Sequence, residues 1–248
     1  MSKILITGST KGLGYESALW FAKKKHKLIL VGRDERDLKK ILLKLPFKKN
    51  HKYICLDLQD PNQIKKIDPK NKMFVGLNKI IHCAGGGLGL KDPMISYENF
   101  LKLLNLNFLS AVELNNKFIP IMKNKNSKII HIGSIASYEA VGSLGYNCSK
   151  AIISAYVRTL GRELIKNKIT VTGLMPGGFM GYKNAMWRLK KRNPNAYDKF
   201  IKTRLPAGKM FKAKDLMPII DTICEKQVPM LSGSLISMDA GEGRAYYN

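Results

Sequence analysis

The sequence predicts an α/β fold in which a single domain forms a doubly wound parallel sheet with helices on both faces. Short apolar runs alternate with amphipathic helical patterns along the whole chain, which is the order typical of such sheets. The runs are continuously apolar and do not alternate with polar residues, as expected for strands buried on both faces. A glycine-rich segment also joins the first run to the first helical pattern, a further feature of doubly wound folds.

The predicted elements follow one another in a regular order. Strands are expected at Lys3–Ile6, Leu28–Val31, Tyr53–Leu56, Lys79–His82, Lys128–Ile132, Ile169–Leu174 and Leu235–Met238. Helices are expected at Leu13–Lys24, Asp34–Lys44, Pro61–Ile67, Tyr97–Lys123, Tyr146–Lys166 and Asp215–Glu225. Lysines close the first helix, where they suit the negative end of the helix dipole. Leu38, Ile41 and Leu45 give the second an apolar face, and Pro61 opens the third where proline needs no N–H partner.

Residues 177–214 interrupt this alternation. The segment holds glycines, prolines, Trp187 and a basic cluster over residues 188–192. Its 38 residues exceed a simple connection between a strand and a helix. We therefore expect short helices that form a lid or wall over a substrate site, within one domain that spans residues 1–248.

The charge balance is strongly basic, with 43 basic and 18 acidic residues and a net charge of +25. Eight of the basic residues are arginines and 35 are lysines, which are spread along the whole chain. Proteins that read nucleic acid rely on arginine because its planar group binds phosphates and bases through paired bonds. A solvated lysine-rich surface is therefore favoured over a nucleic-acid partner. A polyanion partner stays the alternative, and an anionic substrate would also be attracted.

The composition bounds the class of protein. Hydrophobic residues make up 45% and charged residues 25%, as in folded globular domains. No apolar run reaches 18 residues, so no membrane-spanning helix is expected. The apolar run after Met1 is too short for a secretory signal, so a cytoplasmic location is expected. The cysteines and histidines lack the spacing of metal ligands, so no metal site is expected.

The segment Thr7–Gly14 reads Thr-Gly-Ser-Thr-Lys-Gly-Leu-Gly and joins the first strand to the first helix. Glycines allow the backbone to approach a pyrophosphate, and the N–H groups at the start of a helix attract its charge. In this strand–loop–helix context the segment predicts a dinucleotide site. The residues expected to contact the cofactor are Gly8, Ser9, Thr10, Lys11, Gly12, Leu13 and Gly14.

The end of the second strand selects between the two nicotinamide cofactors. An acidic residue near this point binds the ribose hydroxyl of NAD(H) in dinucleotide folds. Gly32 offers no carboxylate, whereas Arg33 follows it and Lys11 lies in the phosphate loop. Two cations favour a 2′-phosphate, so NADP(H) is the preferred cofactor and NAD(H) stays possible.

Tyr146 and Lys150 form the candidate catalytic pair. They are four residues apart, which places them on one face of the predicted helix. A neighbouring cation lowers the pKa of a phenol from about 10 toward the working pH. Tyr146 is therefore a candidate general acid or base.

Taken together, these motifs resemble the short-chain dehydrogenases/reductases, a family of Rossmann-fold enzymes. The resemblance covers nearly the whole chain, and its motifs occur in the family's order. They are Thr7–Gly14, Asp57 after the third strand, Ala84-Gly85 after the fourth, Asn107, Ser134, Tyr146 with Lys150, Pro176-Gly177 and Asp239–Gly241. The resemblance implies an NADP(H)-dependent oxidoreductase that interconverts a carbonyl and a secondary alcohol and works as a homodimer or homotetramer.

The resemblance also implies roles for individual residues. Tyr146 would exchange a proton with the substrate oxygen, and Ser134 would hydrogen-bond that oxygen. Lys150 would bind the nicotinamide ribose and tune Tyr146, while Asn107 would hold a water of a proton relay. Further contacts to the cofactor are implied for Asp57, Leu58, Ala84, Gly85, Tyr146, Lys150, Pro176, Gly177 and Phe179.

Three positions depart from the family pattern. His82-Cys83 replaces the usual pair of asparagines, and His82 is expected to supply a structural hydrogen bond to a neighbouring strand. The interval from Ser134 to Tyr146 is one residue shorter than usual, which leaves Ser137 as a second candidate. Gly181 stands where a threonine usually caps the nicotinamide.

Other functions stay open at this point. A protein of the same fold could sense the cofactor without catalysis, although the intact Tyr146–Lys150 pair argues against that role. A polyanion-binding protein could use the basic segment Lys183–Lys214. A sugar-nucleotide epimerase or dehydratase of the related extended family is disfavoured by the chain length and the spacing of the loop glycines.

Overall fold

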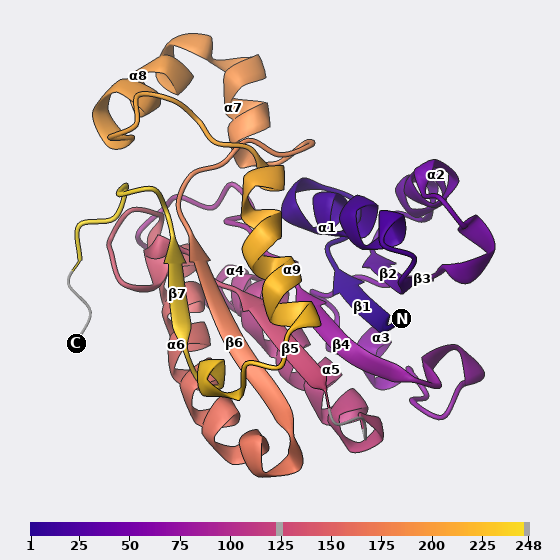
Figure 1. Cartoon of the computed structure of the whole chain (residues 1–248). Coiled ribbons are helices and arrows are strands. Elements are labelled where there is room, and N and C mark those ends of the chain that lie inside the picture. The colour runs from indigo at the N-terminus through magenta and orange to yellow at the C-terminus, as the bar shows by residue number, and fades with distance from the viewer. Residues whose placement is uncertain (123–125, 246–248) are drawn as a thin grey trace.

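The computed structural model describes residues 1–122 and 126–245. Its strands are β1 (Lys3–Thr7), β2 (Lys27–Gly32), β3 (Lys52–Cys55), β4 (Leu77–His82), β5 (Ser127–Ile132), β6 (Ile169–Pro176) and β7 (Leu235–Met238). They pair in parallel in the order β3-β2-β1-β4-β5-β6-β7 (Figure 1). The chain reverses its direction of travel across the sheet between β1 and β4, which is the point where doubly wound sheets place their ligands. The predicted fold class is confirmed.

The helices cover both faces of this sheet (Figure 1). They are α1 (Gly12–Lys23), α2 (Glu35–Lys44), α3 (Pro61–Lys65), α4 (Tyr97–Leu104), α5 (Ser110–Phe118), α6 (Leu144–Leu164), α7 (Ala185–Arg192), α8 (Pro194–Arg204) and α9 (Met217–Glu225). The local sequence determines where several helices begin. The Asp34 carboxylate accepts the N–H of Asp37 at 3.1 Å and caps α2. Pro218 in the first turn of α9 needs no N–H partner there.

Two predicted helices differ from the observed ones. The long helix expected at Tyr97–Lys123 is divided into α4 and α5 by a π-helical turn at Asn105–Leu109, and Lys123 lies outside the described residues. The helix expected from Asp215 begins as a 3-10 turn at Ala213–Leu216, and α9 proper starts at Met217. Both differences come from backbone hydrogen bonding, which the apolar pattern does not report.

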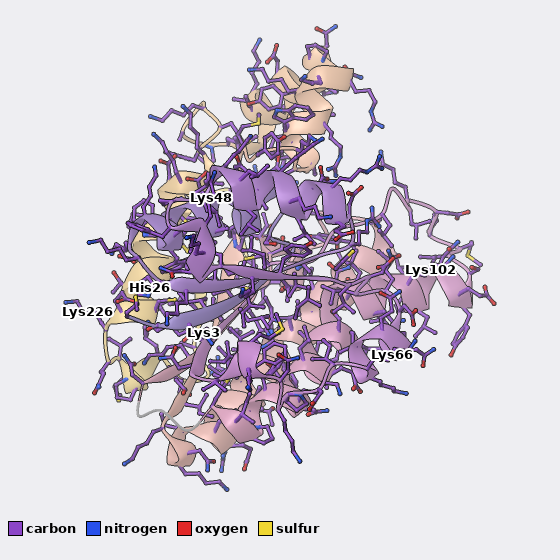
Figure 2. The ribbon with its side chains drawn as sticks, turned by 90° about the vertical axis from the view of Figure 1, so that its right-hand side faces the viewer. Lys3, His26, Lys48, Lys66, Lys102 and Lys226 are labelled. Atoms are coloured by element: carbon purple, nitrogen blue, oxygen red, sulfur yellow. The ribbon has the colours of Figure 1, made fainter. Side chains whose placement is uncertain are left out.

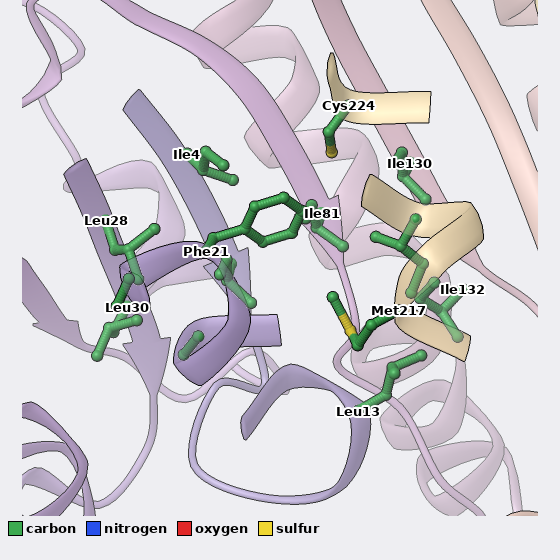
Figure 3. Close-up of a cluster of buried hydrophobic side chains, with 14 of the residues drawn as sticks. Ile4, Leu13, Phe21, Leu28, Leu30, Ile81, Ile130, Ile132, Met217 and Cys224 are labelled. Atoms are coloured by element: carbon green, nitrogen blue, oxygen red, sulfur yellow. The ribbon is translucent and has the colours of Figure 1, made fainter. Parts of the chain in front are cut away.

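The strand residues alternate between two separate cores. Ile4 and Ile6 of β1 point to the face covered by α1, α2 and α9, where Phe21 and Met217 fill the space between helices and sheet (Figure 3). Leu5 points to the opposite face, which α3, α5 and α6 cover. Each fully buried side chain of this size contributes about 1.5–3 kcal/mol to folding through the hydrophobic effect. The two cores together explain why the strands are apolar on both faces.

The predicted insertion holds the helices α7 and α8, which lie beyond the carboxyl ends of the strands (Figure 1). Its two ends are tied together because the Met180 N–H donates to the Phe211 carbonyl and the Ala213 N–H donates to the Met180 carbonyl, both at 2.8 Å. The insertion also touches the start of α1, where the Gly12 N–H donates to the Tyr182 carbonyl at 2.7 Å. The fold therefore places this segment next to the glycine-rich loop.

Within the ranges 1–122 and 126–245, no helix has both the length and the apolar character that a membrane crossing needs. In the same part of the chain, no three His, Cys, Asp or Glu side chains are grouped so that they could hold a metal ion.

Candidate active site

The glycine-rich loop after β1 has a tight backbone that favours glycine. Gly8 and Gly12 have φ angles of +63° and +54°, in the left-handed region. A Cβ at Gly14 would lie 2.4 Å from the Gly8 carbonyl oxygen, and one at Gly8 would lie 2.9 Å from the Cα of Ala84. The loop therefore folds tightly onto itself and onto the end of β4, and its shape depends on these three residues.

The loop offers its helix N-terminus to an anion. Lys11 is the N-cap of α1, its side chain makes no capping bond, and the first turn of α1 holds no acidic residue. The positive end of the helix dipole is therefore not neutralised by its own turn, which suits a bound phosphate. The buried Ser9 fixes the loop because its N–H and its hydroxyl both donate to the Val31 carbonyl, each at 3.1 Å. Leu13, the next residue after Gly12, is buried in the core, so only its backbone can reach a ligand.

The end of β2 brings together the residues expected to select the cofactor. Gly32 carries no carboxylate, and a Cβ at this position would lie 3.1 Å from Thr10 Cγ2, closer than an ordinary contact. Arg33 follows with an exposed side chain. Lys11 lies close enough to help hold the pKa of Asp34 below its usual value, although the main cause is the hydrogen bond from the Asp37 N–H. Two cations therefore lie at the end of β2, and the Asp34 carboxylate beside them caps α2.

Asp57 and Leu58 follow β3, on the same side of the sheet switch point as Arg33. One Asp57 carboxylate oxygen accepts the Gln59 N–H at 3.0 Å, and the Asp57 N–H donates to the Gln63 side chain at 2.9 Å. Leu58 is buried in the core below α3, so its side chain is not available to a cofactor. Of the two predicted contacts, Leu58 can serve only through its backbone.

The end of β4 lies between the glycine loop and the candidate catalytic residues. The Ala84 N–H donates to the Thr7 hydroxyl at 3.1 Å, which fastens β4 to β1. A Cβ at Gly85 would lie 2.8 Å from Asn107 Oδ1 and 3.1 Å from Lys150 Nζ. Gly85 therefore allows both side chains to come up against the backbone after β4.

Asn107 is buried in the π-helical turn between α4 and α5. Its amide oxygen accepts the Gly86 N–H at 2.9 Å, and its amide nitrogen donates to the carbonyls of Gly86 at 3.1 Å and Leu103 at 2.9 Å. π-helical turns occur frequently at functional sites. Here the turn points a polar side chain at the site while the flanking helices stay packed on the core.

Ser134, Tyr146 and Lys150 come together as the sequence predicts. The Lys150 ammonium nitrogen donates to the Ile132 carbonyl at 2.9 Å and lies 5.8 Å from the centre of the Tyr146 ring. Burial lowers the pKa of Lys150 to about 8. Burial also raises the pKa of Tyr146, and a hydrogen bond with the Ser134 side chain opposes that rise. A phenol, a hydroxyl and an ammonium therefore share one small site.

Ser137, the second serine candidate, has a different partner. Its hydroxyl donates to the Lys150 carbonyl at 2.9 Å and so fastens the backbone of α6 to the 3-10 turn after β5. Ser134 caps that turn by accepting the Ala136 N–H at 3.2 Å. The geometry therefore favours Ser134 as the hydroxyl beside Tyr146 and gives Ser137 a positioning contact.

Pro176 is the last residue of β6, and Gly177 and Phe179 follow it. The structure adds a residue that sequence reasoning missed. The Gly177 N–H donates to the Met238 carbonyl at 3.3 Å. The Phe179 side chain is partly buried against the core below α1 and α9. The additional residue is Glu242, whose buried carboxylate accepts the Gly178 N–H at 2.5 Å.

Glu242 connects three segments around the predicted nicotinamide end of the site. It lies after β7, binds the loop after β6, and has one oxygen 3.8 Å from the Arg204 guanidinium in α8. Burial raises the pKa of the Glu242 carboxyl, while the Gly178 hydrogen bond and Arg204 oppose the rise. No local motif marked Glu242, because its partners are more than 35 residues away in the sequence.

A cluster of buried polar side chains supports the site from below. The His82 ring donates to the Asn115 amide oxygen at 2.9 Å and stacks on His131 of β5, with ring centres 4.6 Å apart. His82 thus contacts the neighbouring strand as expected, but its hydrogen bond goes to α5. The Asn115 amide nitrogen donates to the Tyr156 hydroxyl at 3.1 Å. Burial lowers the pKa of His82 to about 4 and that of His131 well below its ordinary value.

Comparisons with known proteins agree with this architecture. A family model described as short chain dehydrogenase matches residues 2–191. Glucose 1-dehydrogenase of Gluconobacter oxydans is 23% identical over 245 residues, covering 96% of this chain and 91% of that protein. NADP-dependent 3-hydroxy acid dehydrogenase of Schizosaccharomyces pombe is 29% identical over 182 residues, covering 70% of each chain. L-Sorbose reductase from Gluconobacter frateurii, solved with NADPH and L-sorbose, superposes with a TM-score of 0.87 at 22% identity, over 99% of this chain and 97% of that one.

Proposed function

Because the chain belongs to the short-chain dehydrogenase/reductase family, we propose that it is an NADP(H)-dependent oxidoreductase acting on a carbonyl or a secondary alcohol. The observation that carries this proposal is the grouping of Ser134, Tyr146 and Lys150 at the carboxyl ends of the strands, with Lys150 5.8 Å from the Tyr146 ring. The bound nicotinamide would supply or accept the hydride. The chain's own residues would hold the substrate oxygen and move the proton.

The residues at the dinucleotide end fit this cofactor. The backbone of Gly8, Gly12 and Gly14 leaves space that side chains would fill, next to a helix N-terminus that has no side-chain cap. Arg33 and Lys11 would hold the 2′-phosphate of NADP(H), and the absence of a carboxylate at Gly32 disfavours the ribose hydroxyl contact typical of NAD(H). NAD(H) remains a possible second cofactor.

Proton transfer is assigned to Tyr146. Its hydroxyl donates a proton to the developing alkoxide during reduction and accepts one during oxidation. The Lys150 ammonium lies beside the phenol and stabilises its ionised form electrostatically, since no carboxylate within residues 1–122 and 126–245 forms an ion pair with it. Ser134 hydrogen-bonds the same oxygen, and Asn107 positions the backbone of Gly86 beside it.

The substrate is a small molecule with a carbonyl or hydroxyl group, and the insertion would form one wall of its site. Arg204 lies on α8 and faces Glu242, which in turn holds the loop at Gly178. The insertion also carries many further cations and few acids, so we propose that an anionic group on the substrate is tolerated there. The cations are Lys183, Arg188, Lys190, Lys191, Arg192, Lys199, Lys202, Lys209, Lys212 and Lys214. We further propose a homodimer or homotetramer, as in the family.

The first experiment titrates NADPH and NADH against the protein and follows fluorescence. We expect NADPH to bind more tightly than NADH, and Arg33→Ala to weaken NADPH about tenfold while leaving NADH unchanged. Arg36→Ala is the matched control, because Arg36 is an exposed arginine in the adjoining helix. Equal affinity for both cofactors would contradict the NADP(H) preference. Binding of neither would overturn the oxidoreductase proposal and favour a polyanion-binding role.

A second experiment tests the proton donor with a panel of ketones, keto acids, sugars and acyl thioesters. Tyr146→Phe is expected to lower kcat by about 10³-fold, because the phenol's proton has no replacement. NADPH affinity and thermal stability are expected to stay unchanged. Tyr97→Phe, at an exposed tyrosine, is the control. Full turnover by Tyr146→Phe would remove Tyr146 from the mechanism.

A further inference from the structure

A second cleft lies at the opposite end of the sheet from the candidate active site, where β1, β2 and β3 begin. Its volume is about 340 Å³, and five lysines line it. They are Lys3, Lys27, Lys49, Lys52 and Lys72, and together they are called the lysine cleft below. Figure 2 shows Lys3 at one end of the strands, with Lys66 and Lys102 on the other side of the molecule.

Sheet register and two short turns bring these lysines together. Lys3 of β1 is the direct partner of Lys27 of β2, and Lys52 of β3 pairs with Ile29, two residues further along β2. Lys49 comes from the 3-10 turn at Lys48–Asn50, just before β3. Lys72 comes from a second such turn at Lys72–Phe74, just before β4. Four segments distant in sequence therefore present cations to one concave surface.

The positive charge of the lysine cleft is not compensated by the protein. No acidic side chain lines the cleft, and among residues 1–122 and 126–245 no ion pair joins any of the five lysines to an acid. The Lys3 ammonium is held in place by the carbonyls of Met73 at 2.9 Å and Val75 at 2.5 Å. Burial lowers the pKa of Lys3, and repulsion from Lys27 adds to that effect.

Two other cations at the same end of the sheet have acidic partners. Lys79 lies 2.7 Å from Glu225, and Lys24 contacts Asp221. Like charges that converge without a counter-ion repel one another, and a bound anion that touches several of them removes that repulsion. The lysine cleft differs from these pairs because its negative partner would be an external anion and not a side chain of the protein.

We propose that the lysine cleft binds a small, multiply phosphorylated anion. Lysine ammonium groups act as mobile point charges that suit phosphate oxygens, whereas base recognition prefers arginine. A concave site of this volume suits a compact molecule, while a nucleic-acid strand needs an extended groove with aromatic platforms. Strand β1 separates the cleft from the glycine loop by roughly 15 Å at about 3.3 Å per residue. The site is therefore separate from the dinucleotide site.

The test is calorimetric titration of the full-length protein in 150 mM salt. Inorganic tripolyphosphate probes a linear phosphate chain and inositol hexakisphosphate a compact ring. The cleft variant is Lys27→Gln with Lys52→Gln, and the matched control is Lys66→Gln with Lys102→Gln. All four lysines are exposed, and each pair lowers the net charge by the same amount. Unfolding curves of the variants check that both fold as the wild type does.

We expect at least one of the two probes to bind the wild type, and the cleft variant to weaken that binding about tenfold or to lose one equivalent. The control variant is expected to bind as the wild type does. An equal effect of both variants would show general attraction to a basic protein and would overturn the proposal. Retention of the whole isotherm by the cleft variant would place the anion at the glycine loop and would also overturn it. Failure of both probes to bind would do the same.

Discussion

Lys150 and Lys79 are both almost fully buried, at opposite ends of the same sheet, and their surroundings differ. Lys79, in β4 near the amino ends of the strands, has the Glu225 carboxylate 2.7 Å away. Lys150, in α6 at the carboxyl ends, has the Ile132 carbonyl as its hydrogen-bond acceptor, and its pKa is lowered to about 8. The carboxylate partner of Lys79 fits a structural role. Lys150 is hydrogen-bonded to a neutral carbonyl, so its charge can influence the neighbouring Tyr146.

Two of the buried histidines, His26 and His82, differ in the same way. His26, at the amino end, lies 3.5 Å from Glu225, which opposes the lowering of its pKa by burial. His82, at the carboxyl end, has the neutral Asn115 as its partner, and its pKa is lowered to about 4. At His26 a nearby carboxylate therefore offsets part of the effect of burial on the pKa, whereas at His82 burial dominates.

The sharpest test of the comparison exchanges each lysine for methionine and measures catalysis. Lys150→Met is expected to lower kcat/KM by about 10²–10³-fold, because the charge that stabilises the ionised Tyr146 is lost. Lys79→Met is expected to leave kcat/KM unchanged, since Lys79 lies at the other end of β4. Initial rates with NADPH and a carbonyl substrate found in the panel measure both. Equal losses in the two variants would break the comparison.

The second test measures stability by urea unfolding. Lys79→Met is expected to reduce the free energy of unfolding by about 1–3 kcal/mol, because Glu225 loses its partner. The loss stays below that of a fully enclosed pair because the Glu225 side chain is 36% exposed and can be hydrated. Adding Glu225→Gln is expected to recover part of the loss. A double variant no more stable than Lys79→Met alone would show that the ion pair is not the cause.

The third test uses acid. His82 has a folded-state pKa of about 4, below the ordinary 6.5, so the unfolded chain binds the extra proton first. Stability is therefore expected to fall as the pH drops from 6.5 toward 4. His82→Gln keeps a donor for Asn115 without this titration, so it is expected to flatten that part of the pH profile. His26→Gln is the control, expected to flatten the profile less, and the reverse order would contradict the comparison.

Periodicity and spacing were sufficient to predict the sheet and the proximity of Tyr146 and Lys150. The strands are apolar on both faces because two helical layers cover them, and that pattern is visible in the sequence. Tyr146 and Lys150 could be paired because one helix carries both, so four residues of spacing fix their relative position. The importance of the glycines in the glycine-rich loop could be predicted for the same reason, because the backbone constraint involves residues close together in the sequence.

Other parts of the site depend on contacts that no local pattern contains. Glu242 binds Gly178 and faces Arg204 only because β6, β7 and α8 meet in space. The partner of His82 is Asn115, from the far side of a crossover. The lysine cleft could not be predicted from the sequence because its lysines lie on four separate segments. The sequence showed only a high overall charge.

The π-helical turn at Asn105–Leu109 also determines the directions in which the side chains of the following helix α5 point. Each residue of a helix turns the next by about 100°, so one residue more or less rotates all later side chains around the axis by that angle. The fully buried Leu114 and Phe118 keep their places in the core because the wider turn accommodates the residue that brings Asn107 inward. A continuous α-helix one residue shorter would present the same faces to the sheet with no amide in the site. The turn thus works as a spacer that adds a polar position without disturbing the apolar register on either side.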